Sequence, residues 1–256
     1  MKKIVFLSLL VSVLGWSCSE SKRKINESII DLKQDSIAGT AVLPKVSFYQ
    51  YEDSSNFPDA ILELYTPLGN QVFRPGKVPF EFNIKNFSYF EEVSQNPKLF
   101  LIFNGGDRIG FFSPIFQREL TEGTYRVVAY LVDGDGYSLK NFGNYIDRDF
   151  MVGDSRAFPY SAEPYIALNL PTNEQTLPFG EELIIDFLVL GGDMKLDRLK
   201  VQIRVNDLEY EVDHMSPVRV ANLPIGDYKV NVKLTRTDGK ELEGPFSSVV
   251  KTVYVR

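Results

Sequence analysis

The chain has 256 residues, of which 44% are hydrophobic and 24% are charged, a composition that is ordinary for a globular protein. At roughly 100–150 residues per domain, this length predicts one large domain or two small ones. The formal net charge of −6 argues against nucleic acid as a partner, because nucleic acid requires a basic face.

The first predicted element is a secretory leader over residues 1–17. Two lysines precede an apolar run, residues 4–14, that is too short to span a bilayer. Residues 15–18, Gly-Trp-Ser-Cys, resemble a bacterial lipoprotein cleavage site, although glycine and tryptophan stand where leucine and a small residue are usual. The resemblance implies that Cys18 carries a lipid anchor to the membrane. Ser19, in place of aspartate, resembles lipoproteins sent to the outer membrane, so we expect a cell-envelope location. An ordinary signal peptide with an incidental cysteine is the alternative.

A flexible tether is predicted next, over residues 18–43. This stretch is rich in charge and has no aromatic residue after the cysteine, so it buries too little apolar surface to fold alone. As a flexible coil it would span about 25–30 Å. A short helix over residues 25–32 would be marginal in isolation.

The rest of the chain contains an internal repeat. The dipeptide Ser-Pro at residues 113–114 recurs 103 positions later at residues 216–217. Further matches at the same shift are Leu120 with Leu223, Gly123 with Gly226, Tyr125 with Tyr228, and Asp135 with Asp238. We therefore predict two copies of one module, at residues 44–154 and 155–256.

Each copy has the pattern of antiparallel strands. Residues 78–84 and 183–189 alternate apolar residues with others, a period of two that buries one face of a strand. Further strands are expected over 99–103, 125–131 and 150–152, with counterparts over 199–205, 228–234 and 253–255. No helical period of ten or more residues follows the tether. The fold class is therefore predicted as all-β, with one sandwich in each copy.

One motif in each copy carries a family resemblance. Leu120, Gly123 and Tyr125, like Leu223, Gly226 and Tyr228, resemble the tyrosine corner of immunoglobulin-like and fibronectin type III sandwiches. The resemblance implies two tandem immunoglobulin-like β-sandwiches, each with a tyrosine ring buried and its hydroxyl turned back to upstream backbone. The modules also resemble accessory domains of secreted bacterial proteins, which act as spacers or binders. The mature chain has no cysteine pair and no tryptophan, so the antibody-type core is excluded.

Catalytic and metal chemistry find little support in the sequence. Asp133 and Asp135 form a weak calcium candidate, but Asn144 stands where an EF-hand has its bidentate carboxylate, and a hairpin turn is the better interpretation. His214 is the only histidine, which excludes a three-histidine zinc site. We therefore predict no catalytic residue, no resident metal, no cofactor and no enzymatic activity, although paired carboxylates of the glycosidase kind stay open.

Aromatic residues are the better lead to a function. They are more numerous in the first module, either as an exposed binding surface or as packing at the sandwich ends. In the loop after residue 139, aromatic and amide side chains interleave, and we predict a binding patch there: Tyr137, Asn141, Phe142, Asn144 and Tyr145.

The predicted function is therefore a non-catalytic envelope lipoprotein that binds or scaffolds a partner protein. The alternative is a glycan-binding surface lipoprotein of a polysaccharide-uptake system, whose members resemble this plan of a lipid anchor followed by tandem sandwiches. The lack of tryptophan in the mature chain weighs against the glycan alternative, because tryptophan is a favoured sugar-stacking residue.

Overall fold

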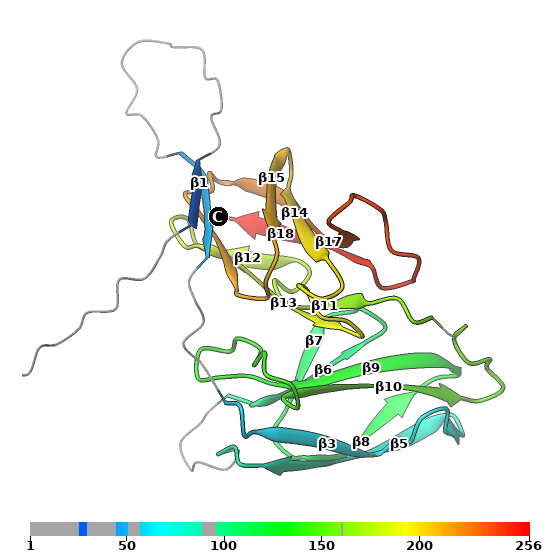
Figure 1. The fold of residues 1–256 in the computed structure, drawn as a ribbon. Coiled ribbons are helices and arrows are strands. Elements are labelled where there is room, and N and C mark those ends of the chain that lie inside the picture. The colour runs from blue at the N-terminus through cyan, green and yellow to red at the C-terminus, as the bar shows by residue number, and fades with distance from the viewer. Residues whose placement is uncertain (1–25, 30–44, 51–56, 89–95, 160) are drawn as a thin grey trace, which may run out of the picture.

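A computed structural model of the chain describes residues 26–29, 45–50, 57–88, 96–159 and 161–256. All of its regular secondary structure is β-strand, and the predicted all-β class is confirmed (Figure 1). Among these described residues there is no helix with the length and hydropathy needed to cross a membrane. The predicted leader and Cys18 lie outside the described residues.

The first sandwich consists of two facing sheets. The outer sheet contains, in spatial order, β3 (Ile61–Thr66), β5 (Gly76–Lys85) and β8 (Ile115–Leu120). The inner sheet contains β4 (Val72–Phe73), β10 (Tyr145–Val152), β9 (Gly123–Leu131), β6 (Leu99–Phe103) and β7 (Arg108–Phe111). Alternating apolar residues of both sheets meet in one core that includes Phe80, Leu101 and Phe150.

The second sandwich repeats the same strand order. One sheet contains β11 (Tyr165–Leu170), β13 (Leu183–Leu190) and β16 (Val218–Ala221), extended by β2 (Ser47–Gln50) and β1 (Asn26–Ile29). The other contains β12 (Gln175–Leu177), β18 (Ser248–Val255), β17 (Gly226–Arg236), β14 (Leu199–Val205) and β15 (Leu208–Val212). Strand by strand, β3–β10 correspond to β11–β18.

The predicted corner tyrosines have the same surroundings in both copies. The Tyr125 hydroxyl donates to the Thr121 carbonyl oxygen at 2.9 Å, and the Tyr228 hydroxyl donates to the Pro224 carbonyl oxygen at 2.7 Å. Both acceptors lie four residues upstream in the chain. With their shared strand order, the two domains are immunoglobulin-like β-sandwiches.

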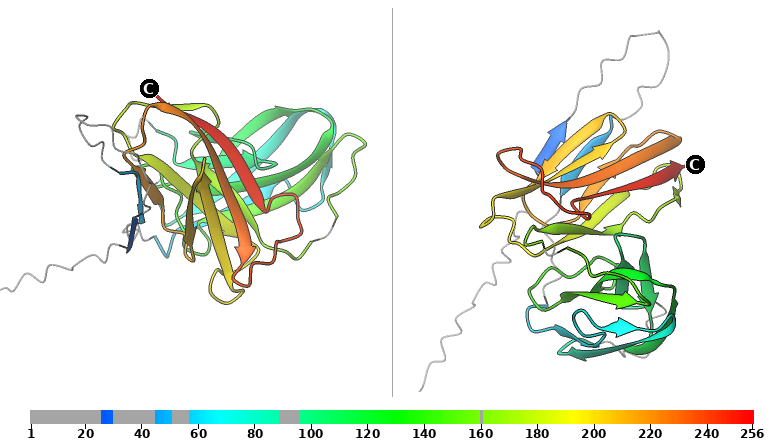
Figure 2. Two further views of the ribbon diagram at one scale, coloured as in Figure 1. Left: turned by 90° about the horizontal axis from the view of Figure 1, so that it is seen from above. Right: turned by 90° about the vertical axis from the view of Figure 1, so that its right-hand side faces the viewer.

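β2 lies with the second sandwich, although it precedes the first sandwich in the chain (Figure 2). It pairs antiparallel with β16, Phe48 opposite Val220. The Phe48 side chain is fully buried in the second core and stacks on Tyr210 with ring centroids 5.2 Å apart. The sequence assigned residues 44–154 to the first module, and this strand departs from that division. The alternation of apolar residues predicts a strand and its buried face, but not which sheet receives it.

Part of the predicted flexible tether is also a strand. β1 pairs antiparallel with β2, with Asn26 opposite Gln50 and Ile29 opposite Ser47. The expectation for residues 18–43 rested on low hydrophobicity, which reports burial of side chains. An edge strand instead pairs through its backbone, and hydropathy does not report that.

The two sandwiches pack sheet against sheet. A third apolar cluster lies between them, built from residues of β6 and β9 on one side and β11 and β13 on the other: Ile102, Val128, Tyr130, Val132, Tyr165, Ala167, Leu188 and Leu190. In Figure 1 the sheet of β11 and β13 lies directly against the sheet of β6, β9 and β10. The molecule is thus four sheets deep, with three apolar layers between them.

Candidate functional site

A buried carboxylate on β13 holds the two sandwiches together. Asp186 has no exposed surface, and its Oδ2 accepts hydrogen bonds from the Ser138 backbone N–H and hydroxyl, both at 2.8 Å. Its Oδ1 forms an ion pair with Lys140 Nζ at 2.5 Å. Ser138 and Lys140 belong to the first sandwich, so this charge pair crosses the interface. A buried charge is tolerated only when it is paired and hydrogen-bonded, and here both conditions are met.

Asn169 extends this network. Its Nδ2 donates to Asp186 Oδ2 at 2.6 Å and to the Gly136 carbonyl oxygen at 2.9 Å. Its Oδ1 accepts from the Tyr130 hydroxyl at 2.8 Å and from Arg108 Nη1 at 3.0 Å. Fully satisfied polar networks of this kind fix one arrangement of the groups around them. The relative position of the two sandwiches is therefore specified by directional bonds as well as by apolar packing.

A second group of polar contacts, centred on Arg126, lies at another part of the same interface. The Arg126 guanidinium makes a bidentate pair with Asp149, at 2.7 and 2.6 Å. It also lies over the rings of Tyr165, Phe246 and Phe158, at 4.7, 5.4 and 5.6 Å from their centroids. Cation–π contacts gain strength when the ring excludes water. Arg126 thus joins β9 to aromatic residues that follow the first sandwich in the chain.

The Asp-Gly-Asp-Gly string is a turn that contacts the second sandwich. Asp133 Oδ1 accepts from the backbone N–H groups of Asp135 and Tyr137, both at 2.9 Å. The Gly136 carbonyl oxygen is taken by Asn169, as described above. Over the described ranges, no group of three or more His, Cys, Asp or Glu side chains is placed to hold a metal ion. The turn interpretation accounts for these contacts. In the second copy the turn bond comes from the other aspartate position: Asp238, the counterpart of Asp135, accepts from the Lys240 N–H at 3.0 Å.

Three residues of the predicted binding patch are used inside the protein. Asn144 is fully buried, and its Nδ2 donates to the carbonyl oxygens of Phe57 and Ala60, at 3.1 and 2.7 Å. Asn141 Oδ1 accepts from the Phe57 N–H at 3.2 Å. The Tyr137 hydroxyl accepts from Arg219 Nη2 at 3.0 Å, across the interface. Interleaved amides had suggested ligand contacts, but Asn141 and Asn144 satisfy backbone groups of their own sandwich, and Tyr137 contacts the second sandwich.

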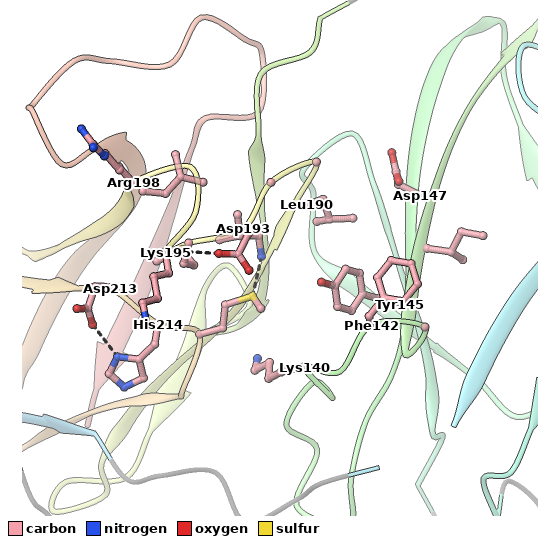
Figure 3. A pocket seen from close by; sticks show the side chains of 18 of the residues that line it. Lys140, Phe142, Tyr145, Asp147, Leu190, Asp193, Lys195, Arg198, Asp213 and His214 are labelled. Atoms are coloured by element: carbon pink, nitrogen blue, oxygen red, sulfur yellow. Dashed lines mark hydrogen bonds and ion pairs between the residues drawn. The ribbon is translucent and has the colours of Figure 1, made fainter. Parts of the chain in front are cut away.

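The other two residues of the patch line a cleft between the sandwiches. Phe142 and Tyr145 lie on its first-sandwich wall, and the opposite wall comes from the turn after β13 and the turn after β15 (Figure 3). The cleft has a volume of about 1330 Å³. A cleft of this size can take a small ligand or a segment of a partner.

The floor of the cleft is apolar. Leu190 and Met194 are buried there, and the Met215 sulfur accepts a hydrogen bond from the Val189 N–H at 3.2 Å. At the mouth, the Phe142 side chain is 96% exposed. An aromatic ring that far into solvent gives little stability to the fold.

Tyr145 faces the opposite wall. Its ring is partly buried, and its hydroxyl makes no hydrogen bond to any described residue. Burial of the ring and the nearby negative charge of Asp193 raise the pKa of the Tyr145 hydroxyl, so it stays a neutral donor. A ligand in the cleft therefore meets an available hydroxyl on one wall and a carboxylate on the other.

Charged side chains surround the cleft on the second-sandwich side. Lys195 and Arg198 are exposed cations, and His214 Nδ1 lies 2.9 Å from Asp213 Oδ1. The His214 interaction lowers the pKa of the Asp213 carboxyl. The two side chains are 47% and 86% exposed, which is the setting of a solvated pair.

Sequence analysis did not single out the second wall. Gly191 and Gly192 form a bend beside Pro164, where a Cβ built on Gly192 would lie 2.6 Å from the Pro164 Cγ. This close approach requires glycine.

Comparisons with known proteins identify no family. No protein-family model matches the chain, and no curated protein matches it in sequence. Among solved structures, the chain is similar to fibronectin(III)-like modules of Clostridium thermocellum CbhA, with 13% identity, a TM-score of 0.30, and 77% of this chain and 94% of that one covered. Three N-terminal domains of the highly immunogenic outer capsid protein of bacteriophage RB49 match with 12% identity and a TM-score of 0.23, covering 92% and 88%.

The insect immune protein hemolin matches with 10% identity and a TM-score of 0.24, covering 92% of this chain and 68% of that one. At these values the matches establish no correspondence between residues. The fold assignment therefore rests on the strand order and the two tyrosine corners of this chain.

Proposed function

We propose that the protein is a non-catalytic binding lipoprotein of the cell envelope that holds an apolar segment of a partner protein between its two sandwiches. The observation that carries the proposal is the cleft, which combines an apolar floor with a fully exposed aromatic ring at its mouth. Its walls belong to two sandwiches joined by a buried ion pair, so the site is preformed. Preformed sites lose less conformational entropy on binding.

The composition of the floor favours a protein segment. Met194 and Met215 are flexible and polarisable, and methionine-rich surfaces adapt to apolar side chains of different shape. Phe142 supplies the kind of aromatic anchor that dominates protein interfaces. The charged residues around the cleft, among them Lys195 and Asp213, then provide a polar rim.

Glycan binding is the second candidate, and one observation favours it. The Tyr145 ring and hydroxyl face Asp193 across the cleft, and an aromatic face beside polar groups is how proteins contact sugars. In this alternative the protein serves a polysaccharide-uptake system at the cell surface.

The membrane anchor is part of the proposal and is tested separately. Acylation of Cys18 would add about 0.8 kcal/mol of membrane affinity for each buried CH₂ group. We expect Cys18→Ser to move the protein from the membrane to the soluble fraction. Unchanged membrane retention of this variant would show that the anchor proposal is wrong.

The binding site is tested by affinity capture from solubilised membranes with the full chain. Phe142→Ala is expected to lose a stoichiometric partner, while Phe179→Ala, which removes another exposed ring outside the cleft, is expected to keep it. Equal capture by both variants would rule out the cleft as the binding site. If no protein is retained, a polysaccharide array with Tyr145→Ala as the matched variant tests the glycan alternative.

A further inference from the structure

β8 has an unpaired edge. It is the outer strand of its sheet, and no other described strand lies along its far side. The equivalent strand of the second sandwich, β16, has β2 along that side in an antiparallel ladder. One copy of the module thus accepts an added strand at a position where the other copy has no strand among the residues that the structure describes.

The register of β8 defines which backbone groups are free. The Phe82 N–H donates to the Pro114 carbonyl oxygen at 2.9 Å, so the even-numbered residues of this segment bond to β5. Alternate residues of a strand direct their N–H and C=O groups to opposite sides. The backbone groups of Ile115, Gln117 and Glu119 therefore point away from β5, toward the open edge. The Ser113 hydroxyl bonds both groups of Ile115, accepting from its N–H at 3.2 Å and donating to its carbonyl oxygen at 2.8 Å, so Gln117 and Glu119 carry the free groups.

The inward side chains of β8 make this edge selective. Phe116 and Arg118 lie where β16 has valines, and the Arg118 guanidinium is 5.0 Å from the Phe103 ring centroid. Arg118 Nε is buried and has no hydrogen-bond partner among the described residues. An inward charge on an edge strand opposes pairing with an ordinary apolar strand. The edge accepts a strand that brings a ring or an acceptor opposite Arg118.

We propose that a second copy of this chain binds here, with β8 pairing antiparallel to β8 about a two-fold axis through Gln117. In this register Phe116 of each copy lies opposite Arg118 of the other, so each guanidinium meets an aromatic ring. The two Gln117 residues exchange two hydrogen bonds, and Ile115 lies opposite Glu119, where pairing replaces the bonds of Ile115 to the Ser113 hydroxyl. The arrangement is self-complementary, as a two-fold interface must be.

The surroundings of β8 suit such a contact. Ile115 is 63% exposed and Phe112, just before the strand, is 66% exposed, so apolar surface is available beside the backbone edge. β8 lies in the sheet that faces away from the second sandwich, so pairing leaves the cleft open. A single strand pair buries less area than a standard interface, and we expect a weak dimer in dilute solution that confinement on a surface would strengthen.

A symmetric disulfide tests the register. Residues of a hydrogen-bonded antiparallel pair have Cα atoms about 5.5 Å apart, which fits disulfide geometry. In the full chain carrying Cys18→Ser, Gln117→Cys leaves residue 117 as the sole thiol. Oxidation is expected to give a covalent dimer in high yield. The matched control is Pro79→Cys, an exposed position opposite Gln117 on β5 and one strand from the edge. A yield no higher than that of the control overturns the proposal.

Proline substitution tests the backbone pairing. Gln117→Pro removes an N–H that the monomer does not use, so the fold and its melting temperature should be kept while the dimer is lost. Gln117→Thr keeps the N–H and should keep the dimer. Analytical ultracentrifugation over about two orders of magnitude in protein concentration measures the dimer dissociation constant of both variants. A chain that stays monomeric throughout, or a dimer that Gln117→Pro does not weaken at least ten-fold, overturns the proposal. If Gln117→Pro fails to fold, the disulfide test decides.

Discussion

The two sandwiches fill the core space beside their equivalent edge strands, β8 and β16, in different ways. In the second, β16 presents the small side chains of Val218 and Val220, and the buried ring of Phe48 comes from β2 to close the space beside Tyr210. In the first, where no described strand lies beside β8, Phe116 stacks on Phe80 with centroids 5.2 Å apart and also on Phe111. The second sandwich, whose edge strand is covered by β2, is filled by the Phe48 ring of β2. The first sandwich is filled by the Phe116 ring of its own edge strand.

This difference explains part of the uneven distribution of aromatic residues along the chain. Phe80, Phe103, Phe111 and Phe116 form one connected set at the β7–β8 side of the first sandwich. These rings fill the part of the core that the Phe48 side chain of β2 fills in the second sandwich. Their number thus reflects the internal packing of a sandwich, and only a few exposed rings such as Phe142 are left to explain by binding.

The largest expected loss of stability comes from removing the Phe48 ring that β2 contributes to the second sandwich. Phe48→Ala should destabilise the second sandwich by about 3–5 kcal/mol, because it leaves a cavity in a fully buried site. Phe116→Ala should cost the first sandwich less, below about 3 kcal/mol, because that ring is only partly buried. Hydrogen exchange of β16 and β8 separates the two effects, and equal losses would show that β2 packing is not special.

Breaking the buried ion pair should loosen the contact between the sandwiches. Lys140→Met leaves the Asp186 carboxylate buried without its cation and should cost about 3 kcal/mol. In the second copy, the loop position that matches Lys140 is the exposed Glu243, so Glu243→Met is a matched control with little effect. Urea unfolding measures both. A Lys140→Met/Asp186→Asn double variant removes the stranded charge but keeps an oxygen acceptor for Ser138, so it should recover part of the loss, and no recovery would contradict this account.

The tyrosine corners allow the two sandwiches to be compared at matched positions. Tyr125→Phe and Tyr228→Phe each remove one hydrogen bond to an upstream carbonyl oxygen, and each should cost about 0.5–1.5 kcal/mol. The bonds have similar lengths in the two copies, so we expect similar losses. Thermal unfolding of both variants is the measurement, and an effect confined to one copy would show that the corners are not equivalent.

The smallest effect is expected on the outer face of the first sandwich. Glu63 bonds to Lys85 and Asn83, and these bonds lower the pKa of its carboxyl from 4.5 to about 2. Because the folded pKa is the lower one, the contribution to stability is complete above pH 4.5 and is lost as the pH falls toward 2. The site is exposed, so this contribution is small. NMR titration should show the Glu63 midpoint near 2, and Lys85→Met should raise it; an unchanged midpoint would contradict the assigned cause.

Local patterns predicted much of the fold. Apolar patterns located β5, β6, β9 and the end of β10 with their counterparts β13, β14, β17 and β18, and the Leu, Gly and Tyr spacing located the two corners. The other strands, among them β8 and β16, were not singled out. The sequence matches from residue 113 onward share a shift of 103, but the ladders place Phe116 opposite Phe80 and Val218 opposite Ile185, so that Phe116 corresponds to Val218 at a shift of 102. Asn222, with a φ of 61°, lies in the left-handed region between β16 and Leu223 and takes up the difference. Such an offset depends on strand pairing, which a sequence match does not report.

The cleft was only half predictable. Phe142 and Tyr145 belong to the loop that the sequence singled out, whereas the opposite wall comes from residues 189–199 and 213–215 of the other sandwich. Packing of the two sandwiches depends on Asp186 and Asn169, polar residues whose burial no hydropathy pattern indicates. A site built at such an interface becomes visible only once both partners are placed.

The pairing of β2 with β16 has a mechanical consequence. β2 precedes the first sandwich in the chain, and β18 is the last strand of the chain. Both strands belong to the second sandwich. Tension applied between residue 45 and Arg256 therefore passes through the β2–β16 ladder and bypasses the first sandwich. Only after that ladder has separated does the first sandwich enter the covalent line of tension. The β2–β16 pairing thus protects the first sandwich, and the wall of the cleft that the first sandwich forms, from tension along the chain.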